Sequence, residues 1–295
     1  MLFSLILVGR KMNLKLYNGV EIPNIGLGAK IIGFGEENQK AFDAEYDFYS
    51  YAIESGACTM YDTSAAYSRN DEALGQAIYD SGKRKEVRIM TKVSNAQQRQ
   101  GNIRKAFEGH LKYLKSDYVD YYLIHWPNTG TYIKTYLEME KLYEEGLIKA
   151  IGVCNCNIHH LRELECYANI KPMINQFEIT PIFTNDALVN YCKAFDIMPI
   201  AYSAVARMHD VLVRGEPIRK LSEKYNKTPS QIIMKWNEQL GRPALVQTRN
   251  AEHFHEMFSK NNDYSLSEKE IFWINSMNDN VRFRYNSDMA DFSIL

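Results

Sequence analysis

Short apolar runs alternate with longer amphipathic stretches along most of this chain. The runs read NIGLGA, CTMYDTS, VRIMTKV, YVDYYLIHW, IKAIGVCN, PMINQFEI, IMPIAYSAV and PALVQTR, and each has the composition of a buried strand. The stretches between them have the apolar spacing of helices, and several stop at a glycine, as helix ends prefer: Gly56, Gly82, Gly146 and Gly241. The pattern therefore predicts strands and helices in alternation, which is an α/β fold with a parallel sheet.

The number of repeats distinguishes the two common parallel folds. Eight apolar runs with no Pro/Gly/Ser-rich linker between them favour a single (β/α)8 TIM barrel. The rival is a doubly wound nucleotide-binding fold, which needs a GxGxxG turn, and the nearest candidate, at Gly26 and Gly28, lacks the third glycine. Asn18–Gly19, between LKLY and VEIP, predicts a β-hairpin ahead of the barrel.

The amino-terminal residues stand apart from this pattern. The apolar run Met1–Val8 is shorter than the ~20 residues of a membrane span, and no positive stretch precedes it as in a signal peptide. We interpret residues 1–11 as a leader upstream of a second start at Met12, or as an extra amino-terminal segment. Residues 12–295 then form the barrel domain.

Composition narrows the class of partner. Hydrophobic residues make up 45% and charged residues 24% of the 295, which is typical of a folded globular protein and excludes general disorder. The formal net charge of −1 provides no basic excess for a phosphate backbone, so nucleic acid is not expected. We expect a small-molecule substrate, no membrane association, and a monomer or weak homo-oligomer.

The cysteine and histidine patterns predict no metal site. The 5 cysteines form no CxxC pair, and Cys154 and Cys156 lack a second cluster to complete a metal shell. His159–His160 and the pair His253 and His255 are interpreted as solvated helix residues. Reduced thiols predict a cytoplasmic protein.

Several charged, polar and aromatic side chains follow the ends of the predicted strands, where the chemistry of a TIM barrel is located. They are Asp62 and Tyr67, Lys92, His125 with Trp126, Cys154 with Asn155, Gln176 with Glu178, and Tyr202 with Ser203. Each taken alone is more typical of an ordinary packed or ion-paired residue. Several on consecutive strand ends indicate a shared site.

Four of these residues form a coherent proton-donor site. A free phenol has a pKa of about 10, and a neighbouring ammonium such as Lys92 is expected to lower the pKa of Tyr67. Asp62 keeps that lysine charged, while a neutral His125 orients a carbonyl oxygen. Such a site is suited to general-acid catalysis of carbonyl reduction, with the hydride supplied by a cofactor.

The sequence also resembles a known family. The segments LYNGVEIPNIGLG, YDTSAAY, TKV, YVDYYLIHWP, GLIKAIGVCN, INQFEI, AYSAV, YNKTPSQIIMKW and the tail NSDMADF are similar, in order, to the motifs of the aldo-keto reductase family. The likeness is greatest to bacterial short-loop members similar to 2,5-diketo-gluconate reductase. It implies NAD(P)H-dependent reduction of an aldehyde or ketone, with Tyr67 as acid, Lys92 and Asp62 as its tuners, and His125 orienting the substrate.

The same resemblance implies a nicotinamide site. Asn155 and Gln176 are expected to bind the carboxamide, and Tyr202 to stack on the ring. Cys154 stands where the family usually has serine, which weakens one hydrogen bond. The other residues that the resemblance assigns to the cofactor are Ser203, Gln247, Thr248, Arg249, His253 and Glu256.

The segment after the last strand departs from the family pattern. Gln247 and Thr248 occupy the positions of a Lys-Ser pair, and His253 that of an arginine, which in NADPH-preferring members bind the 2′-phosphate. Arg249 can offset part of this loss of cations, because arginine binds phosphate well. We therefore expect use of NADH, or of both NADH and NADPH.

Three further residues are candidates for the substrate pocket: Lys30, Trp126 and Ala66. Lys30 is either a solvated loop lysine or a cation that selects an anionic substrate such as a keto-sugar acid. Two alternatives to a carbonyl reductase remain open. One is a barrel that binds a dinucleotide as a non-catalytic sensor, and the other is a specialised, redox-neutral biosynthetic enzyme.

Overall fold

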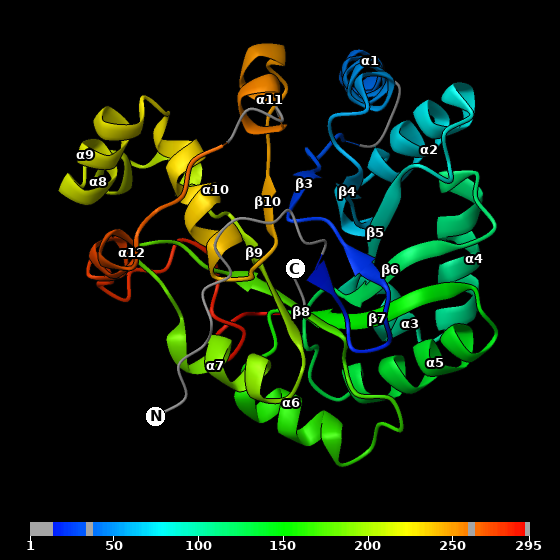
Figure 1. The fold of residues 1–295 in the computed structure, drawn as a ribbon. Helices are drawn as coiled ribbons and strands as arrows, with labels where there is room; N and C mark the ends of the chain where they lie inside the picture. Colours follow the sequence, from blue (N-terminus) through cyan, green and yellow to red (C-terminus); the bar gives the residue numbers. More distant parts are fainter. Residues whose placement is uncertain (1–13, 34–37, 259–262, 293–295) are drawn as a thin grey trace.

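Eight parallel strands form a closed barrel at the centre of the molecule (Figure 1). The computed structural model describes residues 14–33, 38–258 and 263–292. The strands, each hydrogen-bonded to the next and β10 to β3, are β3 (Ile25–Gly28), β4 (Met60–Asp62), β5 (Arg88–Val93), β6 (Val119–Ile124), β7 (Ile148–Cys154), β8 (Ile174–Glu178), β9 (Met198–Tyr202) and β10 (Ala244–Val246). Each lies within one of the eight apolar runs, so the predicted TIM barrel is confirmed.

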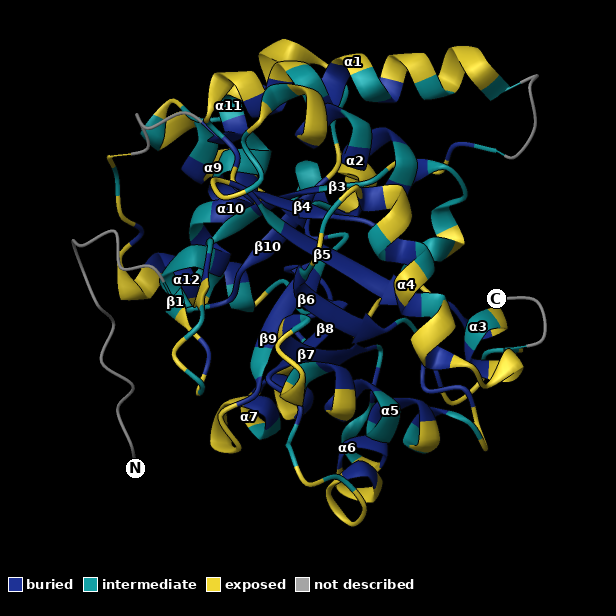
Figure 2. Ribbon diagram, turned by 90° about the vertical axis from the view of Figure 1, so that its right-hand side faces the viewer, coloured by how far each residue is buried: buried dark blue, intermediate teal, exposed yellow. Residues whose placement is uncertain are grey.

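Helices surround the barrel and cover the outer face of the strands (Figure 2). Those that the apolar spacing predicts are α1 (Gln39–Ser55), α2 (Asn70–Ser81), α4 (Ile103–Leu114), α5 (Tyr132–Glu144), α6 (Ile158–Glu165), α7 (Asp186–Ala194), α9 (Glu216–Tyr225), α10 (Pro229–Gln239) and α11 (Ala251–Phe258). Gly56 and Gly82 cap α1 and α2 in the left-handed conformation, with φ of 61° and 67°. Glycine adopts this conformation without steric cost, which explains why the helices end there.

The sequence pattern did not predict the shorter elements. These are η2 (Ala65–Tyr67), α3 (Asn95–Gln100), η3 (Ala206–Met208), α8 (Asp210–Val213) and α12 (Glu268–Asn275). Except for α12, which has 8 residues, they span too few turns to show a helical period. Their ends are fixed by local capping instead, as in α3, where the Ser94 hydroxyl accepts a hydrogen bond from the Gln97 amide and the Gln97 side chain accepts one from the Ser94 amide.

The predicted hairpin closes the end of the barrel where the strands begin. β1 (Leu14–Lys15) pairs antiparallel with β2 (Glu21–Ile22) across the turn at Asn18–Gly19. The Tyr121 hydroxyl donates a hydrogen bond to the backbone carbonyl of Glu21 at 2.6 Å, which ties the hairpin to β6. Residues 1–11 and the second start at Met12 lie outside the described residues.

The carboxyl-terminal tail, residues 283–292, crosses the opposite end, which we call the mouth of the barrel. Glu178, at the end of β8, accepts hydrogen bonds from two backbone N–H groups of the tail, at 2.7 and 2.9 Å. Asn157, after β7, donates to a tail amide oxygen at 3.3 Å. The ring of Trp126, after β6, lies 6.2 Å from that of Phe292. The tail therefore passes the ends of three successive strands.

None of the helices in the described part of the chain combines the length and the apolar character that a membrane span requires.

Candidate active site

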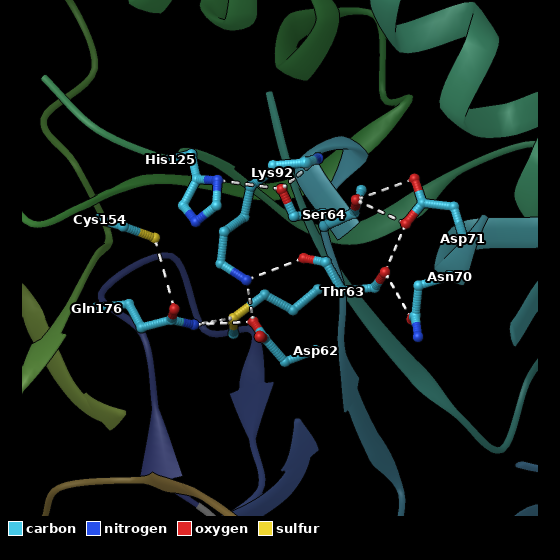
Figure 3. Close-up of polar contacts among 12 residues, drawn as sticks. Asp62, Thr63, Ser64, Asn70, Asp71, Lys92, His125, Cys154 and Gln176 are labelled. Atoms are coloured by element: carbon cyan, nitrogen blue, oxygen red, sulfur yellow. Dashed lines mark hydrogen bonds and ion pairs between the residues drawn. The ribbon is translucent and has the colours of Figure 1, made fainter. Parts of the chain in front are cut away.

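A buried ion pair lies at the mouth. Asp62 is the last residue of β4, and Lys92 lies near the end of β5, the next strand of the barrel. The Lys92 ammonium donates to Asp62 Oδ1 at 2.6 Å and to the carbonyl oxygen of Thr63 at 2.9 Å (Figure 3). Burial, the largest single effect, disfavours a charged lysine, but the interactions with Asp62, Tyr67 and Cys154 together outweigh it, and the pKa of Lys92 is raised above its ordinary value. The lysine is therefore cationic at neutral pH.

Tyr67 reaches this pair through the short helix that follows β4. The hydroxyl of Ser64 accepts a hydrogen bond from the Ala66 backbone amide at 3.1 Å, which caps η2. The half-buried Tyr67 ring then lies with its centroid 5.5 Å from the Lys92 ammonium. Its edge faces His125, with ring centroids 5.5 Å apart and planes at 90°. The fold thus brings together all four residues of the predicted proton-donor site.

His125 is neutral, and one of its tautomers is favoured. Burial, with the cations Lys92 and Arg284 as further causes, lowers the pKa of His125 to about 3. Its Nδ1 lies 3.2 Å from the Ser64 hydroxyl (Figure 3). The Ser64 side chain is buried, and within the described residues Nδ1 is the acceptor in reach of its hydroxyl proton, so we assign the hydroxyl as donor to Nδ1. Nε2 then has the imidazole proton and is a hydrogen-bond donor.

The pKa of Tyr67 differs from the sequence prediction. Burial raises the pKa of this phenol, Lys92 lowers it by a smaller amount, and Asp62 raises it. The lysine cannot reverse the effect of burial, because Asp62 lies in direct contact with it and offsets its charge. In this structure the Tyr67 hydroxyl is therefore fully protonated at neutral pH, and Lys92 limits the increase in its pKa.

Gln176, on β8, contacts the ion pair directly, and Cys154, at the end of the neighbouring β7, contacts Gln176. The Gln176 side-chain amide donates to Asp62 Oδ1 at 2.9 Å, and Gln176 is 3% exposed. The Cys154 thiol donates to Gln176 Oε1 at 3.6 Å, a length typical of a weak sulfur hydrogen bond. The thiol itself is un-ionised, because burial raises the pKa of Cys154 above its ordinary value.

Asn155 and Tyr202 form a second polar pair beside the first. The Asn155 amide donates to the backbone carbonyl of His125 at 3.0 Å, and Asn155 has a left-handed backbone with φ of 59°. The Tyr202 hydroxyl donates to Asn155 Oδ1 at 2.6 Å, and its ring is half-buried at the end of β9. Ser203, which follows it, is also left-handed, with φ of 50°. Two amide side chains and a flat ring thus lie together at the mouth.

The segment after β10 presents mostly neutral groups. The amide of the exposed Gln247 donates to the backbone carbonyl of Ala29. The hydroxyl of Thr248 accepts from the Asn250 backbone amide at 3.1 Å. His253 is exposed, and Glu256 is half-buried, on the first turns of α11.

Arg249 has contacts that differ from those the sequence predicts. Its guanidinium pairs with the buried Glu45 of α1 at 2.6 and 2.8 Å, and it also donates to the backbone carbonyls of Gly28 and Thr248. A buried carboxylate holds a cation strongly, because separating the pair leaves an uncompensated charge. The expectation that Arg249 offsets the missing phosphate-binding cations is therefore not supported by its contacts.

The three residues expected in the substrate pocket have different surroundings. Trp126 is 7% exposed, with its ring centroid 6.4 Å from that of His125, whereas Ala66 is exposed beside Tyr67. Lys30 is exposed and lines a cavity of about 360 Å³ between α1 and the start of α11. The assignment of Lys30 to the substrate pocket stays a prediction.

Comparison with known proteins identifies the family. The sequence profile of the Aldo/keto reductase family matches residues 24–279. The chain belongs to this family. It is therefore an NAD(P)H-dependent oxidoreductase acting on a carbonyl or alcohol group, and the sensor interpretation is not needed.

Named relatives of this reductase cover nearly its whole length. It is 37% identical to glyoxal reductase of Bacillus subtilis, over 94% of this chain and 97% of that protein. It is 34% identical to methylglyoxal reductase DkgA of Escherichia coli, over 82% and 86% of the two chains.

Solved structures give the same result. The aldo-keto reductase MGS-M4, from a deep-sea metagenome library, superposes with a TM-score of 0.84 and 34% identity, covering 94% of this chain and 99% of that one. A Bombyx mori aldo-keto reductase in complex with NADP superposes with a TM-score of 0.78 and 27% identity, covering 93% and 95%.

A buried polar layer supports the reductase site from beneath. Asp71 accepts a hydrogen bond from the Thr63 hydroxyl at 2.7 Å (Figure 3). It also accepts one from His110 Nδ1 at 2.6 Å, and all three residues are buried. Asn70 accepts from the same Thr63 hydroxyl at 3.0 Å. Since the carbonyl of Thr63 binds the Lys92 ammonium, this layer fixes the position of the lysine. The sequence analysis did not single out these residues, because Thr63 follows β4 but is uncharged, and Asn70, Asp71 and His110 lie on α2 and α4 rather than at strand ends.

The sequence analysis also missed Arg284, a charged residue at the mouth. It lies on the tail, where its backbone amide donates to Glu178 Oε2 at 2.9 Å. Its positive charge lowers the pKa of His125, after the larger effects of burial and Lys92, and it acts in the same direction on Tyr67 and Tyr202. The tail was recognisable from NSDMADF, but no sequence pattern shows that the arginine ahead of it faces the mouth.

One cluster of potential metal ligands is present in the described part of the chain. His159, His160 and Asp288 place one ligand atom each within 4.8 Å of one another. The Nδ1 atom of His160 accepts a hydrogen bond from the Asn157 backbone amide at 3.2 Å, which caps α6. In a neutral imidazole with an acceptor Nδ1, the other nitrogen has the proton and is not free to bind a metal. The contacts thus assign His160 to helix capping.

Proposed function

We propose that this reductase reduces small aldehydes or ketones with NADH, and that Tyr67 donates the proton to the carbonyl oxygen. The observation that supports the assignment is the position of the Tyr67 ring, 5.5 Å from both the Lys92 ammonium and the His125 ring centroid at the mouth. The names of the relatives, glyoxal reductase and methylglyoxal reductase, point to small dicarbonyl compounds as substrates.

The raised pKa of Tyr67 is compatible with this role. A proton donor must be protonated before the reaction, and burial keeps the phenol in that form at neutral pH. As the proton leaves, negative charge develops on the phenol oxygen, and the nearby Lys92 ammonium stabilises it. Asp62 keeps Lys92 charged throughout, because the two are in contact at 2.6 Å.

His125 acts as a hydrogen-bond donor to the same carbonyl oxygen. The Ser64 hydroxyl holds Nδ1 as an acceptor, so Nε2 has the proton that points toward the substrate. A fixed donor at this place stabilises the charge that develops on oxygen in the transition state. The imidazole remains neutral, so it orients the carbonyl without competing with Tyr67 as the acid.

The side chains at the mouth fit a nicotinamide group. Asn155 and Gln176 offer amide donors and acceptors that match a carboxamide, and the Tyr202 ring offers an apolar face for a heterocycle. When bound, the cofactor supplies the hydride that adds to the carbonyl carbon. In this structure the Asn155 side chain binds the His125 carbonyl and the Tyr202 hydroxyl, and the Gln176 side chain binds Asp62 and Cys154, so a carboxamide exchanges some of these hydrogen bonds for its own.

The adenosine end favours NADH. A 2′-phosphate is dianionic and requires cations, whereas Gln247 and Thr248 are neutral and Arg249 is engaged by Glu45. The 2′-hydroxyl of NADH needs only ordinary hydrogen-bond partners.

Steady-state kinetics with each cofactor test the proposal. We expect a higher kcat/KM with NADH than with NADPH for the wild-type enzyme. Introducing Gln247→Lys together with His253→Arg is expected to raise kcat/KM for NADPH by about 10–100-fold, the effect of charge-assisted hydrogen bonds to a phosphate. Glu252→Lys, on the exposed face of the same helix, is the control for a change in net charge. A wild-type preference for NADPH would contradict the assignment.

A further inference from the structure

The tail places one arginine at the mouth in a defined position. Glu178 is 1% exposed, and its two carboxylate oxygens accept the backbone N–H groups of Phe283 and Arg284 at 2.7 and 2.9 Å. This double anchor fixes the backbone from which the Arg284 side chain extends. The side chain is exposed to solvent in the absence of a ligand.

The position of the Arg284 charge follows from the groups on which it acts. It interacts electrostatically with Tyr67 after β4, His125 after β6 and Tyr202 at the end of β9. Tyr67 and His125 follow β4 and β6, and Tyr202 ends β9, so all three lie at the mouth and the charge that acts on them lies on this side of the barrel. Its backbone anchor at the end of β8 is consistent with that position.

Other cations near the site have partners of their own. Lys92 is paired with Asp62 at 2.6 Å, and Arg249 with Glu45 at 2.6 Å. Among the residues that the structure describes, Arg284 forms no ion pair within 4.0 Å, and the oxygens of the nearby Glu178 are occupied by backbone amides. The guanidinium is thus available to an anion that enters the mouth.

We propose that Arg284 binds a carboxylate group of the substrate, so that the enzyme prefers carbonyl compounds that contain an acid group near the reacting carbonyl. This inference rests on the proposed function, because it assumes that the carbonyl binds at Tyr67 and His125. A guanidinium binds a carboxylate through two parallel hydrogen bonds, which fixes orientation as well as charge. Of the two interpretations of Lys30, this proposal favours the solvated loop lysine and assigns the substrate cation to the tail.

A matched pair of substrates isolates the carboxylate. The aldehyde acid 4-oxobutanoate and its tertiary amide, N,N-dimethyl-4-oxobutanamide, share a free carbonyl and a chain length but differ in charge. We expect the wild-type ratio of kcat/KM, acid over amide, to exceed one and to fall as NaCl is raised, because salt screens an exposed cation. In Arg284→Gln the ratio is expected to fall by about 10–100-fold, as for loss of a charged hydrogen bond.

Two control variants separate Arg284 from its neighbours. Arg282→Gln removes a cation just ahead of the tail, whose guanidinium lies 4.5 Å from the centroid of the Phe183 ring. Lys30→Met removes the lysine beside α1. Both are expected to leave the acid-to-amide ratio within threefold of wild type. Thermal unfolding of each variant shows whether the fold is retained.

The outcomes distinguish failure of this inference from failure of the proposed function. If wild type turns over the amide but Arg284→Gln keeps the wild-type ratio, or Lys30→Met loses it, the arginine assignment is wrong and the reductase mechanism stands. If wild type turns over neither compound, nor methylglyoxal, with either cofactor, the proposed function itself fails.

Discussion

His125 illustrates how one side chain acquires its function from its neighbours. The Ser64 hydroxyl lies 3.2 Å from Nδ1, while burial and two cations lower the pKa of the imidazole to about 3. A histidine in water titrates near pH 6.5 and is charged in part at neutral pH. Here the neutral form is held across the physiological range, which makes the residue an orienting donor rather than an acid.

This yields a prediction for the pH dependence of His125. The folded enzyme is expected to show no titration of this imidazole between pH 5 and pH 8, whereas in urea the same residue titrates near 6.5. The unfolded chain binds this proton at a higher pH than the folded enzyme does. As far as His125 is concerned, the free energy of unfolding is therefore at its full value above about pH 6.5 and decreases as the pH falls toward 3. NMR of the imidazole, assigned by its loss in His125→Gln, measures both midpoints. A folded midpoint near 6.5 would be inconsistent with the account.

For single residues, the sequence predicted where the side chains lie better than it predicted their pKa values. Asp62, Tyr67, Lys92 and His125 were selected because they follow strand ends, and strand ends meet in a parallel barrel. The direction of the Tyr67 pKa shift was predicted wrongly, because the degree of burial of a phenol is not visible in a sequence. Arg284 was missed for a related reason, since its place at the mouth depends on tertiary contacts of the tail.

The elements show where periodicity is informative. Long helices and buried strands were predicted because each repeats its apolar spacing over several turns or residues. The short helices η2 and α3 were not, although η2 is the element that carries Tyr67. Their formation depends on single capping side chains, Ser64 and Ser94, and one serine is too weak a signal to define an element in advance.

The close packing of α2 against α4 leaves no room for a side chain at Gly75. A Cβ atom at Gly75 would lie 2.2 Å from the Tyr113 carbonyl oxygen and 2.5 Å from Leu114 Cα, both backbone atoms. Gly75→Ala is therefore expected to lower the free energy of unfolding by about 1–3 kcal/mol. Gly109→Ala, on α4 with nothing within 4 Å, is the matched control and is expected to raise it by about 0.5–1 kcal/mol. Equal effects in urea unfolding would show that the close approach is unimportant.

In the molecule as a whole, the ion pairs at the two ends of the barrel have different roles: one set stabilises the fold and the other belongs to the active site. At the end where the strands begin, the fully buried Asp120 pairs with Arg84 at 3.0 Å and Lys149 at 3.1 Å and accepts the Ile89 amide at 3.0 Å. These contacts join β5, β6 and β7. At the other end, the ion pair of Asp62 and Lys92 lies in the site. Both are buried ion pairs, but only the second adjoins the reacting groups.

This division predicts that Asp120 is needed for stability and not for turnover. Asp120→Asn is expected to lower the free energy of unfolding by about 2–4 kcal/mol, because it leaves buried cationic and amide donors poorly matched, while kcat stays near the wild-type value. Lys149→Met removes only a part-exposed partner and is expected to cost less than about 1 kcal/mol. Urea unfolding and steady-state kinetics on the same preparations measure both. A large loss of kcat in the folded Asp120→Asn enzyme would contradict the division.

The most direct test of the catalytic account is Tyr67→Phe. In the described part of the chain no hydrogen bond to the Tyr67 hydroxyl is found, so its removal leaves no buried group without a partner, and the ring remains to fill its place. We expect kcat/KM for carbonyl reduction to fall by about 10²–10⁴-fold, the usual effect of losing a general acid. NADH affinity and the unfolding temperature are expected to match wild type. Activity within threefold of wild type in a folded, NADH-binding Tyr67→Phe enzyme would contradict the account.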